Sequence, residues 1–259
     1  MAITTKLCEL LGIEHPIVQG ALGPWSSAEL SAAISNAGAL GSIGTAAMPP
    51  QRVRELLARM GELTDRPFCL NHTARPFVEE SWRFGIEARP KLISYAIGDP
   101  GELPKRAHEA GILFMAQVHT PQQAELAAER GADAIVAQGA EAGGFCGRIS
   151  TMALVPQVVD AVAPIPVLAA GGIADGRGLA AALALGAAGI NIGTRFLSSE
   201  ESPIRDSWRR RILEATRRSR SRLSSPPAPC PAPRAPSTLR HGRCRRPSSS
   251  SGSAGRTKT

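Results

Sequence analysis

Cysteine is scarce in this chain of 259 residues, and the five that it has form no CxxC pair. They stand at Cys8, Cys69, Cys146, Cys230 and Cys244. An odd number without paired spacing argues against both a disulfide framework and a zinc site. We therefore expect reduced thiols, a cytoplasmic location and no metal.

Long apolar runs are missing as well. No stretch approaches the roughly 18 residues that a membrane-spanning helix needs. The first residues, MAITTKLCELLG, lack a basic segment followed by a long apolar one, so they do not indicate a secretory signal. We expect no membrane partner for this chain.

Acidic residues are absent from 217–259, a segment dominated by Arg, Ser and Pro that holds ten arginines and one lysine. The rest of the chain carries 19 basic and 22 acidic side chains, so the formal charge of +8 describes the tail and not the body. Such a composition buries too little apolar area to offset the entropy of ordering. We expect a disordered basic tail at 217–259, separate from a domain at 1–216, and no nucleic-acid partner for that domain. The abrupt change in composition also suggests a shifted reading frame as the origin of the tail.

Short runs rich in Val, Ile, Leu and Ala recur eight times along the body. They occupy 15–20, 39–44, 67–72, 92–97, 113–118, 134–139, 166–171 and 189–194. The segments between them are mostly rich in Ala and Leu, and several close with Gly, which often ends a helix. Eight strands that alternate with helices predict a (β/α)8 TIM barrel, with an open doubly wound sheet as the competing architecture.

In a TIM barrel the active site lies at the carboxyl ends of the strands. Two of these ends are rich in glycine, "AAGGIADGRG" after the seventh strand and "NIGTRF" after the eighth. Loops at these positions commonly bind phosphate, because glycine lets backbone N–H groups approach an anion. Neither GxxxxGK[ST] nor a GxGxxG after a strand is present, so we expect a phosphorylated ligand other than a dinucleotide.

Several segments resemble the nitronate monooxygenase family, formerly called 2-nitropropane dioxygenases. They are "HPIVQGALG", "SNAGALGSIG", "LNHTARP", "VAQGAEAGGFCGR" and "VLAAGGIADGRGLAAALALGAAGINIGTRFL", in order over about 5–205. The resemblance implies an FMN-binding enzyme that oxidises alkyl nitronates with molecular oxygen, on its own or as a homodimer. It also implies that the flavin is lined by Gln19, Gly20, Asn71, Gln138, Gly143, Gly172, Asn191, Ile192, Gly193 and Thr194.

The family pattern EAGGH, whose His is the expected base for a nitroalkane, reads EAGGF here. Phe145 accepts no proton, so that role is lost at that position, and the ring instead suits packing over the flavin. Histidine is the side chain that most readily exchanges a proton near neutral pH, and His72 and His119 fall at strand ends. Both are candidate bases, although preformed nitronates need none. We interpret Glu141 as a loop anchor, and Cys146 lacks a neighbouring base.

Two other functions stay open. A flavin-dependent enoyl-acyl-carrier-protein reductase, which would use NAD(P)H, has a similar barrel and the same EAGG segment. A non-catalytic truncated flavin-binding protein is suggested by Phe145 and by the tail, which stands where the family continues with further helices. We therefore expect the eighth barrel helix and part of the cover over the site to be missing.

Overall fold

Eight parallel strands form the centre of the structure, a computed structural model that describes residues 3–74, 77–96 and 98–214. The strands are β1 (Ile17–Gln19), β2 (Gly41–Gly44), β3 (Phe68–Thr73), β4 (Leu92–Ala96), β5 (Leu113–Val118), β6 (Ala134–Gln138), β7 (Val167–Ala170) and β8 (Gly189–Ile192). All eight predicted strands are confirmed, with ends that shift by at most two residues. The tail predicted at 217–259 lies outside the described residues.

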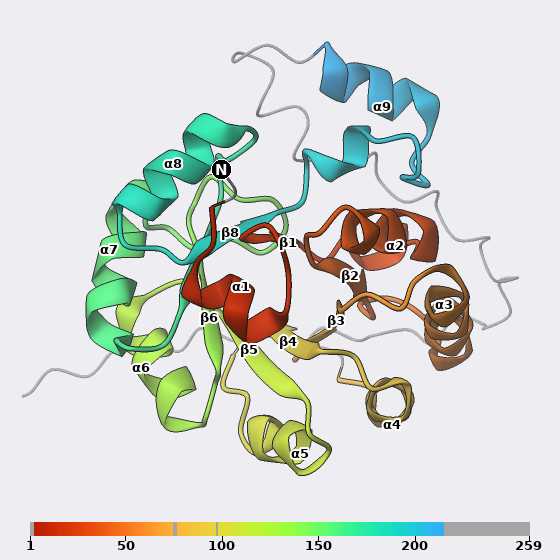
Figure 1. Ribbon diagram of the computed structural model, residues 1–259, viewed down its shortest axis with the longest axis horizontal. Coiled ribbons are helices and arrows are strands. Elements are labelled where there is room, and N and C mark those ends of the chain that lie inside the picture. Colours follow the sequence, from red (N-terminus) through yellow and green to blue (C-terminus); the bar gives the residue numbers. More distant parts are fainter. Residues whose placement is uncertain (1–2, 75–76, 97, 215–259) are drawn as a thin grey trace, which may run out of the picture. The chain divides into compact units, whose positions relative to one another are not determined.

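The strands follow the order β1-β8-β7-β6-β5-β4-β3-β2, so the first strand pairs with the last. This order gives a TIM barrel and rules out the doubly wound sheet, in which the strand order reverses at the middle of an open sheet. Helices surround the strands in Figure 1, where the barrel is seen nearly end-on. Seven of them connect consecutive strands: α2 (Ala28–Asn36), α3 (Pro50–Leu63), α4 (Glu79–Ala88), α5 (Leu103–Glu109), α6 (Pro121–Glu129), α7 (Thr151–Val162) and α8 (Gly176–Ala184).

Several of these helices begin at a residue whose side chain accepts a hydrogen bond from the first turn. Ser27 accepts from the Leu30 amide before α2, and Thr120 accepts from the Gln123 amide before α6. Asp175 does the same for the Arg177 amide at the start of α8. Each cap satisfies a backbone N–H that has no partner inside its helix.

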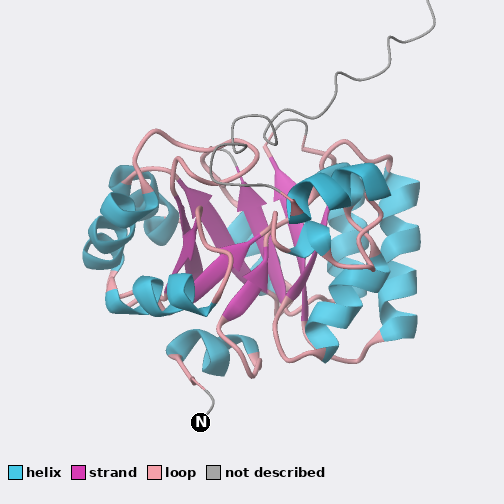
Figure 2. Cartoon of the chain, turned by 90° about the horizontal axis from the view of Figure 1, so that it is seen from above, coloured by secondary structure: helices cyan, strands magenta, loops and turns pink. Residues whose placement is uncertain are grey.

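The short helix α1 (Lys6–Leu11) closes the end of the barrel opposite the carboxyl ends of the strands (Figure 2). Leu7, Cys8 and Leu11 are buried against inward side chains of the strands, among them Val18 and Leu92. A second apolar layer lies between the outer side of the sheet and helices α4 to α8. Because neighbouring residues of a strand point to opposite sides, each strand supplies both layers.

The barrel closes between β1 and β2 through a short seam. Val18 and Leu40 form an isolated parallel bridge, and the backbone N–H of Gln19 donates to the Leu40 carbonyl at 2.8 Å. Gln19 Oε1 accepts from the Ser42 amide, also at 2.8 Å. The side chain of Gln19 thus continues the ladder of hydrogen bonds beyond the point where the two backbones part.

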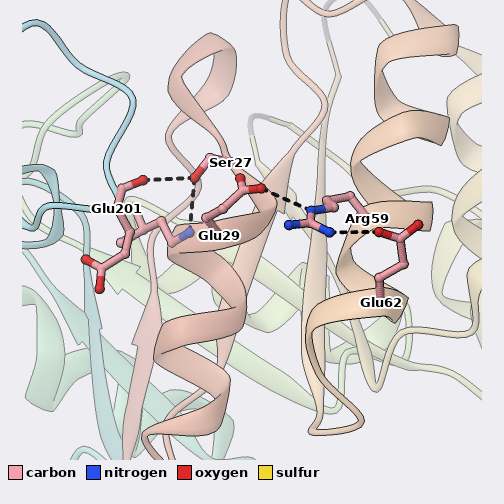
Figure 3. A network of polar contacts seen from close by, with 6 residues as sticks. Ser27, Glu29, Arg59, Glu62 and Glu201 are labelled. Carbon is pink, nitrogen blue, oxygen red and sulfur yellow. Dashed lines mark hydrogen bonds and ion pairs between the residues drawn. The ribbon is translucent and has the colours of Figure 1, made fainter.

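The described chain continues past β8 with the 3-10 helix η2 (Phe196–Ser198) and the helix α9 (Asp206–Leu213). No residue of α9 is buried, and its Trp208 ring contacts that of Trp25 edge-on, with centroids 5.2 Å apart. Figure 3 shows another contact of this segment, in which Ser27 Oγ donates to the Glu201 carbonyl at 3.2 Å. Leu197, Ser202 and Ile204 of this segment are buried, and Phe196 packs against the apolar cluster of α2. The segment is therefore held near η1 (Gly23–Trp25) and α2 by the residues before α9.

The outer side of β1 and β8 is covered unevenly. Ile17 and Ile192 are only partly buried, whereas Ile190 of β8 is 3% exposed and Ile93, Phe114 and Ile135 on the outer sides of β4, β5 and β6 are fully buried. The expected loss of the eighth barrel helix stays a prediction, because residues 215–259 lie outside the described part of the chain. None of the helices in that part of the chain is long and apolar enough to cross a membrane.

We predict that Gly41→Ala destabilises the barrel by about 3 kcal/mol or more. A Cβ at residue 41 would lie 1.9 Å from the carbonyl oxygen of Ser31, because α2 packs directly onto β2. Gly61→Ala in α3 is the matched control, since nothing lies within 4 Å of its Cβ position, and alanine there should add about 0.5 to 1 kcal/mol. Urea unfolding of both variants checks this, and equal midpoints would contradict the close packing of α2.

Candidate functional site

Polar side chains replace apolar ones inside the barrel toward the carboxyl ends of its strands. Asn71 is in register with Ser94 on the neighbouring strand, and Asn71 Nδ2 donates to Ser94 Oγ at 2.8 Å. One layer higher, Gln117 is in register with the inward Val136. Gln138 is in register with the inward Ala170. The interior is therefore apolar near α1 and lined by neutral amides and hydroxyls near the opposite end.

A cluster of three side chains joins β5, β6 and the loop that follows β6. Gln117 Nε2 and His119 Nε2 each lie 2.7 Å from Gln138 Oε1. Gln138 Nε2 in turn donates to the Gly143 carbonyl at 3.1 Å. We call Gln117, His119 and Gln138 the amide–imidazole cluster. It holds the loop containing "EAGGF" against the strand ends.

Glu141 anchors the same loop from its other side. Its Oε2 accepts from both the amide and the Oγ1 of Thr151, each at 2.8 Å. Thr151 is the first residue of α7, so the carboxylate sits at the positive end of that helix. The interpretation of Glu141 as a loop anchor is confirmed by these contacts.

The loops after β1, β6, β7 and β8 converge at the mouth of the barrel. A Cβ on Gly20 would lie 2.8 Å from Asn191 Oδ1, and one on Gly143 would lie 3.7 Å from Thr194 Oγ1. Gly172, with φ of +72°, faces Glu141 in the same way at 3.4 Å. The structure thus brings together most of the residues that the family resemblance assigned to the flavin, and glycines stand where these loops come closest.

Two of the assigned residues point elsewhere. Gln19 is 1% exposed and lies in the seam between β1 and β2, with its Oε1 bonded to the Ser42 amide. Ile192 is paired with Gln19 in the register and packs against the outer apolar layer. At the mouth, Ile192 therefore has only its backbone to offer a ligand.

The expectation that His72 lies on the rim is corrected by the direction of its side chain. Asn71 faces the interior, so His72 beside it faces the outer layer, where its ring lies 5.3 Å from Trp82 and 5.9 Å from Phe77. Its Nδ1 lies 3.2 Å from Thr45 Oγ1. Burial lowers the pKa of His72 to about 4, and the charge of Glu79 offsets only part of that effect. The ring is neutral at ordinary pH and closed to a substrate in the mouth.

Phe145 and Cys146 lie on the surface of the loop after β6. The Phe145 side chain is 75% exposed, and Cys146 is an exposed free thiol. Whether Phe145 packs over a flavin stays a prediction. Within the described ranges, no group of three or more His, Cys, Asp or Glu side chains could hold a metal ion.

Sequence reasoning missed three residues of the site: Ser94, Gln117 and Thr151. Ser94 and Gln117 are the lone polar residues of otherwise apolar strands, and each lies an even number of positions from an inward side chain. This period-2 pattern is visible in the sequence. Thr151 carries no such signal, because its role depends on the path of the loop that brings Glu141 to it.

Comparisons with known proteins agree on a family and include relatives with different names. A family model described as nitronate monooxygenase matches residues 4–83 and 74–222. A nitronate monooxygenase of Pseudomonas aeruginosa is 35% identical, over 86% of this chain and 77% of that protein. The solved structure of FabK from Thermotoga maritima superposes with a TM-score of 0.80 and 38% identity, over 83% of this chain and 69% of that one.

A further relative is the (3aS,4S,5R,7aS)-5-hydroxy-7a-methyl-1-oxo-octahydro-1H-indene-4-carboxyl-CoA dehydrogenase of Mycobacterium tuberculosis. It is 41% identical over 222 residues, which are 83% of this chain. The match spans 61% of the length of that relative.

The buried His72 predicts a dependence of stability on pH. Its pKa is about 4 in the folded chain and about 6.5 when unfolded, so the unfolded state binds the extra proton between these values. Stability should fall as the pH is lowered through this window, by about 3 kcal/mol in total. Urea unfolding from pH 7 to 4 should show this loss in the parent and a shallower one in His72→Phe. His15→Gln, at an exposed position, is the control and should keep the parent slope.

Proposed function

Because this chain belongs to the nitronate monooxygenase family, we propose that it is an FMN-dependent enzyme that oxidises alkyl nitronates with molecular oxygen. The observation that carries the proposal is the convergence of glycine loops from four strands over a set of neutral amides at one end of the barrel. We further propose that it acts in the cytoplasm on small molecules, on its own or as a homodimer.

The geometry of the mouth suits a flavin nucleotide. Gly172 lies in the loop that leads into α8, and Gly193 follows the neighbouring strand β8, so backbone N–H groups of both loops and the start of α8 would stabilise a phosphate. The Asn71 amide keeps its oxygen and one N–H, and Gln138 keeps one N–H beyond its bond to Gly143, which matches the mixed polar edge of a flavin ring. Gly20 leaves space that a side chain would fill against Asn191.

A bound flavin would supply the redox chemistry, by accepting electrons from the nitronate before oxygen takes them up. The protein's own residues bind and orient. The apolar interior toward α1 excludes water from below, and the anchored loop after β6 limits its access from above. These features would keep the substrate and the ring together in a partly dry site.

A neutral nitroalkane must lose a proton before it can be oxidised as its nitronate, and Phe145 offers no base for that step. Of the two candidate histidines, only His119 lies at the mouth, where it belongs to the amide–imidazole cluster. We assign the base role to His119 and withdraw it from His72.

A second candidate function is a flavin-dependent reductase or dehydrogenase of an acyl thioester, the class that includes the enoyl-acyl-carrier-protein reductase raised by the sequence. The observation in its favour is the 41% identity to a protein named as a carboxyl-CoA dehydrogenase. A third reading, a flavin binder without activity, is favoured by the exposed Phe145, which offers no base.

One experiment separates the three. The purified protein is loaded with FMN and mixed under anaerobic conditions with ethylnitronate, with NADPH or with an acyl-CoA, while the flavin absorbance is followed. Bleaching by the nitronate and recovery on admission of oxygen supports the first function. Bleaching by NADPH or an acyl-CoA but not by the nitronate contradicts it, and an unbleached bound flavin identifies the third.

The glycine after β7 allows a test of the phosphate site. Gly172→Asp should weaken FMN binding by at least about tenfold, because a carboxylate would face the phosphate. Gly172→Asn is the matched control: it has the same size, lacks the charge and tolerates the positive φ of this residue. Titration of the apoprotein with FMN measures both, and equal affinities of the two variants would place the phosphate elsewhere.

Phe145→His should restore a base at the family position. Because His119 is already assigned as the base and this exposed loop holds the new ring loosely, the ratio of kcat/KM for nitroethane to that for ethylnitronate should rise by about tenfold or less, below what a first general base contributes. Phe145→Gln, polar but not basic, should leave the ratio unchanged. An equal ratio in both variants would show that the loop position does not reach the substrate.

A further inference from the structure

The amide of Gln138 has a fixed orientation. A backbone carbonyl can only accept, so the group of Gln138 that faces the Gly143 oxygen at 3.1 Å must be its NH2. Its Oε1 therefore points the other way, into the amide–imidazole cluster. There it lies 2.7 Å from nitrogen atoms of both Gln117 and His119.

An amide oxygen has two lone pairs, and here each receives one donor. Gln117 contributes its NH2, which fills one lone pair and leaves the other to the imidazole. His119 Nε2 must then carry a hydrogen, because an unprotonated nitrogen would face an oxygen across 2.7 Å with no proton between them. A neutral imidazole has one N–H, so Nδ1 of His119 is the bare nitrogen.

Nδ1 of His119 is also accessible. No hydrogen bond to it forms within the described part of the chain, and it is not among the buried polar atoms that lack a partner there. The loop after β6 lies directly against this side chain, since a Cβ on Gly147 would be 2.7 Å from the Cβ of His119. That loop also carries Phe145, so His119 lies against the same loop as the position that lost its base.

We propose that His119 Nδ1 is the proton acceptor of this site, and that Gln138 and Gln117 are positioning residues that keep this nitrogen bare. The proposal rests on the oxidation of nitroalkanes proposed above. In the step, the Cα–H bond of the nitroalkane breaks and its electron pair stays on the resulting nitronate. The proton forms a new bond to Nδ1, and the imidazolium keeps its Nε2–H bond to Gln138.

The arrangement explains why both glutamines are needed. The Gly143 carbonyl sets the direction of the Gln138 amide, because a reversed amide would place two carbonyl oxygens against each other. Gln117 fills the second lone pair of Gln138 Oε1, so the imidazole meets an oxygen with one place left for a donor. The relay thus runs from a loop carbonyl to the acceptor atom through two side chains with no charge.

The first test is spectroscopic and needs neither flavin nor turnover. Long-range ¹H–¹⁵N spectra of the full chain labelled at histidine, with His119→Gln used for assignment, should show His119 protonated at Nε2, with that proton exchanging slowly with water. In Gln138→Met the slow exchange should be lost, and in Gln117→Met the exchange should become faster than in the parent. Gln157→Met, whose amide bonds only the Ala153 carbonyl on α7, is the control.

The second test is kinetic. His119→Gln keeps an N–H donor near the place of Nε2 and removes the acceptor, so kcat/KM for nitroethane should fall by about 100-fold or more while that for ethylnitronate stays within about threefold. Gln117→Met and Gln138→Met should lower the same ratio by smaller factors.

The outcomes separate the two proposals. A hydrogen on Nδ1 of His119, or exchange unchanged in Gln138→Met, overturns the assignment of the acceptor atom whatever the enzyme does. An equal loss for both substrates in His119→Gln overturns its role as the base. A parent that turns over neither substrate overturns the proposed function and the base role with it, while the spectra still decide the tautomer.

Discussion

The closure of the barrel between β1 and β2 is the constraint on which the site depends. One bridge and the side chain of Gln19 join these strands, whereas every other neighbouring pair shares a longer ladder. If the seam opened, β1 would stay paired with β8, and Gly20 would separate from Asn71 on β3, beyond the other side of the seam. The side chain of Gln19 therefore joins the backbones of two strands. In the sequence this glutamine looks suited to bind a ligand, but in the structure it stabilises the closure of the barrel.

Neutral groups dominate the interior of this mouth. Among the described residues, the inward polar side chains named above are amides, hydroxyls and one imidazole, and the carboxylate of Glu141, which anchors the loop after β6, is bound to the start of α7. These neutral side chains favour a ligand that has an uncharged ring and carries its negative charge on a phosphate group away from that ring. It also lets a proton move to one ring nitrogen without a competing charged acceptor beside it.

Much of the fold could be predicted from the sequence, because eight apolar runs with intervening helices leave few arrangements. The same period-2 rule would have separated Asn71 from His72, since adjacent residues of a strand cannot both face the interior. The contacts of Gln138 and Glu141 could not be predicted, because they depend on how a loop of twelve residues between β6 and α7 returns over the strand ends. Local patterns determine strands, whereas the path of such a loop is set by the contacts it makes.

The helix α1 affects how a substrate enters the barrel and how a product leaves it. Its apolar side chains fill the barrel from one end, and the polar layers lie toward the other, so we expect a ligand to approach the inner amides from the carboxyl ends of the strands. Whatever reaches the inner amides must leave by the route through which it came, past the loop that carries Phe145. A product must then leave before the next substrate can enter through the same opening. The residence time of the product therefore limits the rate at which substrate binds.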